Sequence, residues 1–339
     1  MSLRSEIAEQ PTAAARLIEE GAAEALRLGG LLARAKHVTV VARGSSDNAA
    51  TYGKYLLEGL ARIVTASAAP SLVTRYGTPP RYSGGAVIGI SQSGAAPDVS
   101  AVIAAARRDG ALTVAITNRA ASALGRAAEH VFELRCGPER AIAATKTYTT
   151  SCIALAMLAG AAAGRPLELA PLPDALREAV ESEPSAARIA RRIGRSRALV
   201  VLGRGYAYAA ALEAALKIKE LARVWAEPYS SADFAHGPRA LLERGTPVLL
   251  LAARGATERE TRSLATSLRR RGAKVYAITD DAVLAAKVDD AVLLRRAVGE
   301  LLSPIALVVA AQHVAAHVAR HHGRDPEKPA GLSKVTRTL

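Results

Sequence analysis

The chain carries an internal repeat, and this feature constrains its fold more than any other. Residues 49–61, AATYGKYLLEGLA, align without gaps on residues 210–222, AALEAALKIKELA, at an offset of 161 positions. The same offset carries VIGISQSG (87–94) onto VLLLAARG (248–255), and one residue further on DGALTVAIT matches RGAKVYAIT. A register that is kept through separate landmarks indicates a duplicated unit. The length of 339 residues is enough for two domains of ordinary size.

Each half contains short apolar runs that are separated by segments with a helical pattern. The runs are 38–42, 86–90, 112–116 and 131–134 in the first half, and 198–202, 247–252, 274–278 and 291–294 in the second. Apolar runs of about five residues between helices are typical of buried parallel strands. We therefore predict an α/β protein with two tandem, doubly wound, flavodoxin-like domains, each a parallel sheet flanked by helices.

The same pattern predicts the domain boundaries. We expect a helical segment at 1–34, a first domain at 35–165, a linker helix at 166–195, a second domain at 196–322 and a tail that closes the site at 323–339.

The charge and the composition limit the partners. A formal net charge of +14 suits an anionic partner, because a cationic surface raises the local concentration of anions. Phosphorylated small molecules meet this requirement as well as DNA does, and the alternative is that Arg-rich stretches such as 188–197 are solvated helix faces. Aromatic residues make up only 4% of the chain, which leaves few rings for stacking on bases. We expect no nucleic-acid partner.

The cysteines and the hydropathy indicate a cytoplasmic protein. Cys136 and Cys152 are the only cysteines, too few for a disulfide framework. No uncharged stretch reaches the roughly 20 residues that span a bilayer, so we expect no membrane partner. His313, His317 and His321 have a spacing that could bind zinc, but their helix is otherwise apolar and lacks an accompanying Glu motif. We therefore expect no metal and no cofactor.

Two loops of the first half carry polar groups where ligands bind in open parallel sheets, beyond the carboxyl ends of strands. Ser91, Gln92 and Ser93 follow the run 86–90, and Ser45 and Ser46 follow the run 38–42. Hydroxyls and free backbone N–H groups at a helix N-terminus can bind phosphate, although serines there can also be plain helix caps. The second half has Ala-Ala-Arg-Gly where the first has Ser-Gln-Ser-Gly. The two copies are therefore expected to have specialised, with phosphate held by the first.

The second half places charged groups on one helix. Glu213, Lys217 and Glu220 have the i, i+4, i+7 spacing of a single helix face, which would be an exposed Glu/Lys ladder or an acid–base group. Gly59 occupies the position of Glu220 in the first copy, so this carboxylate is specific to the second. His236 lies in a polar loop at 230–238 and could move protons near neutral pH, although a lone loop histidine is more often structural.

These features resemble the sugar isomerase (SIS) domain family, in particular the isomerase half of glucosamine-6-phosphate synthase and the SIS-type glucosamine-6-phosphate deaminases. The resemblance covers nearly the whole chain. It rests on six motifs in order: EIAEQP (6–11), SQSG (91–94), GPERAIAATKTYTT (137–150), ALEAALKIKE (211–220), AHGP (235–238) and DPEKPAGLSKV (325–335).

The resemblance implies roles for individual residues. Ser45, Ser46, Ser91, Gln92 and Ser93 would bind the substrate phosphate. Glu220 would shuttle a proton between C1 and C2, with Lys217 beside it. His236 would assist ring opening and would come from the partner subunit of a homodimer with a shared active site. Lys334 would close over the sugar and could form a Schiff base with a ketose.

Two residues depart from the synthase pattern: Ala96 stands where the synthase has Thr, and Ala144 stands where it has Ser, so we expect the phosphate affinity or the choice of sugar to differ. The motif AATKTY (143–148) and the lack of the glutaminase half in the sequence resemble the deaminase branch. The expected reaction converts glucosamine 6-phosphate to fructose 6-phosphate and ammonia. The alternatives are another ketose/aldose phosphate isomerase, a deglycase of amine-linked sugar phosphates, or a non-catalytic sugar-phosphate sensor.

Overall fold

The computed structural model describes residues 2–334 and divides into two compact units. Of the described residues, the first unit comprises Thr12–Glu139, Lys146–Ala170, Ser333 and Lys334. The second comprises residues 2–11, Arg140–Thr145 and Pro171–Leu332. Each is built on one five-stranded parallel sheet, which confirms the α/β class expected from the repeat.

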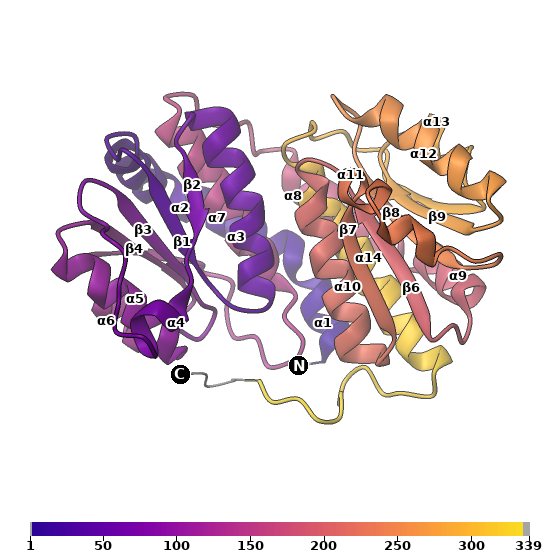
Figure 1. Ribbon diagram of the computed structural model, residues 1–339, viewed down its shortest axis with the longest axis horizontal. Coiled ribbons are helices and arrows are strands. Elements are labelled where there is room, and N and C mark those ends of the chain that lie inside the picture. The colour runs from indigo at the N-terminus through magenta and orange to yellow at the C-terminus, as the bar shows by residue number, and fades with distance from the viewer. Residues whose placement is uncertain (1, 335–339) are drawn as a thin grey trace. The chain divides into compact units, whose positions relative to one another are not determined.

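The first unit alternates strands with helices (Figure 1). Its strands are β1 (Val38–Val41), β2 (Thr65–Ser67), β3 (Ala86–Ile90), β4 (Leu112–Thr117) and β5 (His130–Glu133). Its helices are α2 (Gln10–Leu32), α3 (Ser45–Leu56), the π-helix η1 (Leu57–Ala61), α4 (Pro70–Thr74), α5 (Pro97–Arg108), α6 (Ala123–Ala127) and α7 (Lys146–Ala162).

The second unit repeats this order with extra helices. Its strands are β6 (Ala198–Gly203), β7 (Trp225–Ser230), β8 (Pro247–Ala252), β9 (Lys274–Thr279) and β10 (Asp290–Leu293). Its helices are α1 (Leu3–Ala8), α8 (Leu172–Glu181), α9 (Glu183–Ile193), α10 (Ala207–Ala222), α11 (Ser231–Ala235), the 3-10 helix η2 (Pro238–Leu241), α12 (Glu258–Arg270), α13 (Ala282–Ala285) and α14 (Ser303–His321).

Both sheets have the same strand order. The order is β2-β1-β3-β4-β5 in the first unit and β7-β6-β8-β9-β10 in the second, and all of these pairings are parallel. The chain therefore reverses direction across each sheet between its first and third strands, which is the flavodoxin-like topology. All eight predicted strands are present, whereas the edge strands β2 and β7 were not predicted.

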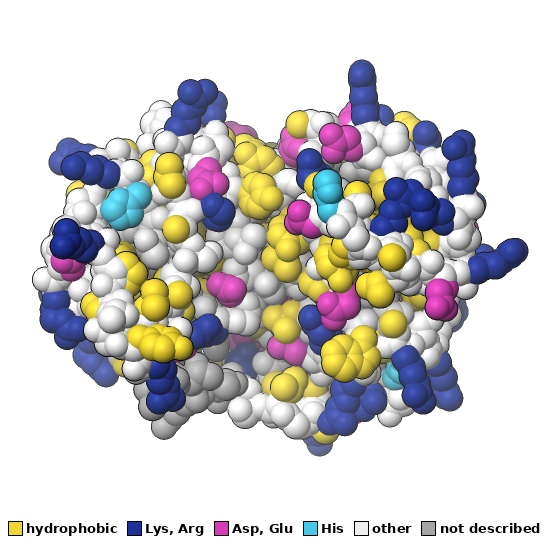
Figure 2. All heavy atoms as spheres, in the orientation of Figure 1, with side chains coloured by type: hydrophobic (Ala, Val, Ile, Leu, Met, Phe, Trp, Pro, Cys, Tyr) yellow, Lys and Arg dark blue, Asp and Glu magenta, His cyan; other side chains and the backbone are white. Residues whose placement is uncertain are grey.

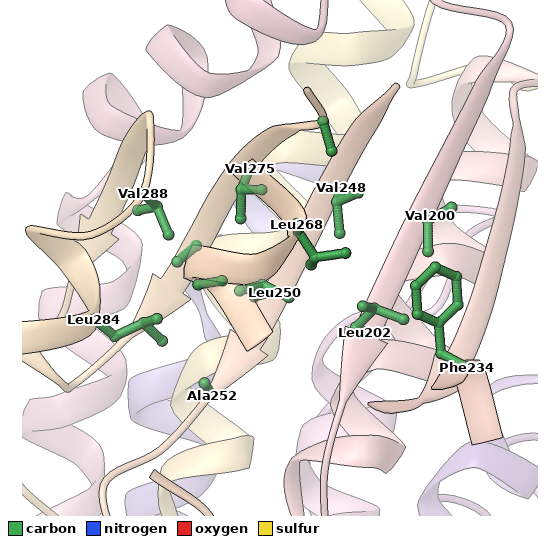
Figure 3. Packing of buried hydrophobic residues seen from close by; sticks show 13 residues of the cluster. Val200, Leu202, Phe234, Val248, Leu250, Ala252, Leu268, Val275, Leu284 and Val288 are labelled. Atoms are coloured by element: carbon green, nitrogen blue, oxygen red, sulfur yellow. The ribbon is translucent and has the colours of Figure 1, made fainter. Parts of the chain in front are cut away.

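The core of the second unit lies where α12 and α13 cover its sheet (Figure 3). Val248 and Leu250 of β8 and Val275 of β9 are buried against Leu268 of α12. These strands are covered by helices on both faces, so buried apolar side chains such as valine and leucine lie on both of their faces. The strands therefore appear in the sequence as continuous apolar runs instead of an alternating pattern. This packing holds the strand ends, and the loops that follow them, in fixed positions.

The EIAEQP motif has a structural role in the second unit. Glu6 of α1 is fully buried, and its carboxylate accepts hydrogen bonds from the backbone N–H groups of Arg140 and Ala141, at 2.5 Å for Arg140. The amide of Gln10 donates to the side-chain oxygen of Gln312 at 2.8 Å. The motif therefore holds the backbone at Arg140 and Ala141, a function that the sequence did not indicate.

Candidate phosphate-binding and acid–base sites

The serine loops of the first unit lie at the switch point of its sheet. β1 and β3 are direct neighbours, with Val41 opposite Gly89, so the loops that follow them emerge side by side at the carboxyl edge. Ligands of open parallel sheets bind in the crevice at this point. The structure thus brings together the two predicted phosphate loops, 45–46 and 91–93.

The hydroxyls of these loops are free to bind a ligand. Among residues 2–334, the side-chain oxygens of Ser45, Ser46 and Ser91 make no hydrogen bond, while Ser93 Oγ accepts one from Ala95 N–H at 3.3 Å. Neither α3 nor α5 has a side-chain cap. The helix-cap interpretation of these serines is therefore wrong. Hydroxyls without a hydrogen-bond partner close to two helix N-termini are a suitable arrangement for an anion.

An ion pair that the sequence did not indicate connects the two loops. Arg43, just after β1, donates from Nε to Oδ2 of Asp98 at 2.7 Å, and Asp98 is almost fully buried in the first turn of α5. Asp98 also accepts from the N–H of Val99. The pair links the loop after β1 to the start of α5 and so stabilises the shape of the candidate phosphate site.

In the second unit, the loop after β8 carries no hydroxyl at the positions that match Ser91 and Ser93. Its switch point lies between β6 and β8, which are neighbours in the sheet. Ala253 and Arg254 follow β8, where the first unit has Gln92 and Ser93. The N–H of Arg254 donates to Asp280 at 2.6 Å, so this loop is held by a carboxylate of its own unit. Such a loop is less suited to an anion.

The helix α10 of the second unit contains a buried group of charges. The side chains of Glu213 and Lys217 are 0% and 1% exposed, and Lys217 Nζ lies 3.4 Å from Glu213 Oε1. Lys217 also donates to Glu220, whose side chain is 23% exposed. The exposed-ladder interpretation is therefore wrong. A buried ammonium between two carboxylates leaves the more exposed one, Glu220, able to exchange protons with a bound molecule.

Within the described part of the chain, His236 is exposed and forms no hydrogen bond with this group. His236 is exposed at the C-terminal end of α11, where its N–H donates to the carbonyl of Asp233 at 3.0 Å. No hydrogen bond within the described residues joins its ring to Lys217 or Glu220. The predicted polar loop 230–238 is wrong in part, because Ser230 ends β7 and the next five residues form α11.

Lys334 is bound to a buried carboxylate of the first unit. Its Nζ donates to Glu139 Oε2 at 2.7 Å, and the Glu139 side chain is fully buried. Glu139 also accepts from the N–H of Thr147 at 3.1 Å and from its hydroxyl at 2.7 Å. The sequence indicated Lys334, but it gave no sign of Glu139 as its partner.

Hydrogen bonds connect the loop after β3 to the neighbourhood of Glu139. The N–H of Asn118 donates to the carbonyl of Gln92 at 3.1 Å, and the side-chain amide of Asn118 donates to the carbonyl of Gly137 at 2.7 Å. Gly137 precedes Glu139 by two residues. Lys334 is thus bonded to a segment that is itself attached to the candidate phosphate loop.

Among the described residues, Cys136 and the histidines of α14 supply neither an activated thiol nor a metal site. Burial raises the pKa of the Cys136 thiol to about 12, so it stays protonated and weakly nucleophilic. In the described residues, no group of three or more His, Cys, Asp or Glu side chains could hold a metal ion. His317 instead contacts Glu183 at 3.2 Å.

None of the helices in residues 2–334 is both long and apolar enough to cross a membrane.

Comparisons with known proteins agree with this architecture. The SIS domain model matches residues 31–161 and 193–321. The glutamine–fructose-6-phosphate aminotransferase (isomerizing) of Gloeobacter violaceus is 35% identical over 97% of this chain and 57% of its own length. The enzyme of the same name from Methanothermobacter thermautotrophicus is 34% identical, over 97% and 56%. The chain therefore spans about half the length of these curated relatives.

Solved structures give the same result. The C-terminal domain of glucosamine-fructose-6-phosphate aminotransferase from Francisella tularensis is 26% identical, with a TM-score of 0.81, and the match covers 96% of each chain. Glucosamine-6-phosphate deaminase from Thermotoga maritima, 22% identical with a TM-score of 0.77, shares the fold over 96% of this chain and 100% of its own. With both of its sheets matched by the same domain model, the chain belongs to the SIS domain family.

Proposed function

We propose that the chain is a phosphosugar isomerase that acts as an aminosugar-phosphate deaminase, converting glucosamine 6-phosphate and water to fructose 6-phosphate and ammonia. The observation that carries the proposal is the division of polar groups between the two copies. The first has free hydroxyls at two helix N-termini, and the second has a buried ammonium between two carboxylates. The family to which the chain belongs supports the phosphosugar class.

The proposed chemistry needs a single proton-transfer group. After ring opening, Glu220 takes the proton from C2 of the open-chain aminosugar and returns it to C1, through an enolamine, which leaves an imine at C2. Water then adds to the imine carbon, and the C–N bond breaks to release ammonia and the ketone of fructose 6-phosphate. Binding of the phosphate by the loops after β1 and β3 would fix the position of the reacting carbons.

The remaining roles follow from the surroundings of each residue. Lys217, bonded to Glu220, would stabilise its carboxylate form between proton transfers. Lys334 would close over the sugar after leaving Glu139. His236 is exposed, and we assign it to ring opening in the site of a partner subunit of a cytoplasmic homodimer. Light scattering gives the mass of the oligomer, and an active monomer would contradict this last part.

The variant Glu220→Gln tests the mechanism in a coupled assay for ammonia release. We expect a loss of turnover of about 10²–10⁴-fold, the range attributed to general acid–base groups, with binding of the sugar phosphate retained. The control is Glu243→Gln, the same change at an exposed carboxylate before β8. Full activity of Glu220→Gln would remove Glu220 from the mechanism. Turnover of another ketose or aldose phosphate, with none of any hexosamine phosphate, would contradict the substrate.

A further inference from the structure

The second unit contains a basic hollow at the amino ends of β8 and β9. It has a volume of about 970 Å³. Six cationic side chains and one carboxylate line it: Arg244, Arg269, Arg270, Arg271, Lys274, Lys287 and Asp289. Lys274 is the first residue of β9, so the hollow lies at the edge of the sheet opposite to the carboxyl ends of the strands. It is therefore distinct from the switch point of this sheet.

Most of these cations lack a carboxylate partner. Within residues 2–334, only Arg269 of the six forms an ion pair, with Asp289 at 3.4 Å. Elsewhere in the same unit, Arg188 and Arg262 are paired with buried or nearly buried aspartates at 2.9 Å and 2.6 Å. Figure 2 shows that Lys and Arg side chains project from much of the displayed face, so exposure alone does not single out a site. The concentration of unpaired cations around one hollow does.

The first copy provides an internal comparison, because the structure fixes which positions correspond. Arg269 Nη1 donates to the carbonyl of Lys287 at 3.0 Å, and Arg107 Nη1 donates to that of Ala127 at 3.4 Å. The strand registers likewise match Pro247 and Lys274 with Ala86 and Leu112. By this correspondence, Ser83, Asp109, Leu112 and Ala127 stand where the second copy has Arg244, Arg271, Lys274 and Lys287.

The comparison shows that the fold does not require these charges. Cations at the C-terminal end of a helix are favourable, which accounts for Arg269 and Arg270 and for their counterparts Arg107 and Arg108. It also favours Arg271, the C-cap of α12, but it does not account for Arg244, Lys274 and Lys287, which are cationic in the second copy alone. Placing them around one hollow costs free energy through like-charge repulsion, and a bound anion would offset this cost.

We propose that the hollow binds a polyphosphate chain, as inorganic polyphosphate or as the phosphate tail of a nucleoside polyphosphate. Its volume exceeds what a single phosphate fills, and guanidinium groups are well matched to phosphate oxygens. No aromatic side chain is among its lining residues, so the site has no ring on which a base could stack. The phosphates, and not the base, would then be recognised. This proposal is independent of the reaction proposed above.

Isothermal titration with tripolyphosphate tests the proposal. The variant Arg271→Asp/Lys274→Leu gives the hollow the first copy's residues, and Arg34→Asp/Lys36→Leu makes the same charge change at exposed residues of the first unit. We expect the first variant to bind tripolyphosphate at least about tenfold more weakly, with a smaller dependence on salt, and the control to bind as the unchanged protein does. ATP should bind about as tightly as tripolyphosphate, and orthophosphate much more weakly.

Several results would overturn the proposal. Equal affinities of the two variants would show that the hollow is not the site. A loss of tripolyphosphate binding in Ser91→Ala, but not in the hollow variant, would place the ligand at the loop after β3. ATP or a DNA duplex binding more than tenfold more tightly than tripolyphosphate would indicate recognition of a base or of a nucleic acid. In each case the ammonia assay still reports on the proposed reaction separately.

Discussion

Replacing Lys217 with Met removes the ammonium of the buried group on α10 but keeps most of its volume. The change leaves Glu213, whose side chain is fully buried, without the cation that lies 3.4 Å from its carboxylate. Loss of one partner from a buried ion pair costs about 3–5 kcal/mol, because the remaining buried charge loses the opposite charge that compensated for its removal from water. Glu220 is affected less, since its side chain is partly exposed to water.

Scanning calorimetry is the appropriate measurement, because a chain of two compact units need not unfold in one step. For a unit of about 150–250 residues, 1 kcal/mol shifts Tm by about 2–4 °C, so we expect the transition of the second unit to fall by about 6–20 °C. The transition of the first unit should stay in place.

The double variant Lys217→Met/Glu213→Leu separates stability from activity. It removes both buried charges, and apolar replacement of a buried pair is often neutral for stability. We therefore expect most of the lost Tm to return while the ammonia assay stays inactive. A shift below about 2 °C in the single variant, or a double variant less stable than the single one, would refute the assignment of Lys217 as the partner of a buried carboxylate.

Two further predictions concern one glycine and one histidine. Gly94 and Gly110 both have positive φ, but a Cβ at Gly94 would lie 1.9 Å from Ser122 Oγ, whereas at Gly110 it would meet nothing within 4 Å. Each change to Ala should cost about 1–2 kcal/mol in backbone strain. Only Gly94→Ala should also weaken sugar-phosphate binding, and equal effects of the two variants in a binding assay would contradict this. Burial lowers the pKa of His313 to about 4. Between pH 6.5 and 4 the unfolded chain therefore binds a proton that the folded chain does not. The free energy of unfolding should fall by about 3 kcal/mol as the pH is lowered through that window. The variant His313→Leu should lose this part of the pH dependence and keep what the nearby Glu183 and His317 contribute. If thermal melts of the variant and of the unchanged protein gave parallel pH profiles, this role of His313 would be ruled out.

The predictable part of the fold is the part with continuous apolar runs. The central strands β3 and β8 are buried at every residue, so each appears in the sequence as an unbroken apolar segment. Of the four edge strands, β5 and β10 keep enough apolar residues to be predicted, whereas β2 and β7 do not. β2 has three residues, two of them exposed, and β7 contains Glu227 and Pro228. Edge strands tolerate polar residues and proline because one side lacks a neighbouring strand, so no apolar run marks them.

The candidate sites were predictable where neighbouring residues act together. The serine loops and the charges on α10 are local motifs with recognisable spacing. By contrast, Arg43 pairs with Asp98 across 55 positions, and Lys334 with Glu139 across 195. Such pairs leave no periodic signal in a single sequence. They became visible only when the fold brought their elements together.

The comparison of the copies also separates what the fold requires from what a ligand requires. Arg107 and Arg269 form the same bond to a backbone carbonyl in both units, so this contact belongs to the shared scaffold. Asp109 accepts hydrogen bonds from the N–H groups of Tyr82 and Ser83, whereas the second copy has Arg271 at that position and still forms the same strand pairing. A residue that differs while the pairing stays the same is free to serve binding. The serines of the first copy and the cations of the second are both residues of this kind.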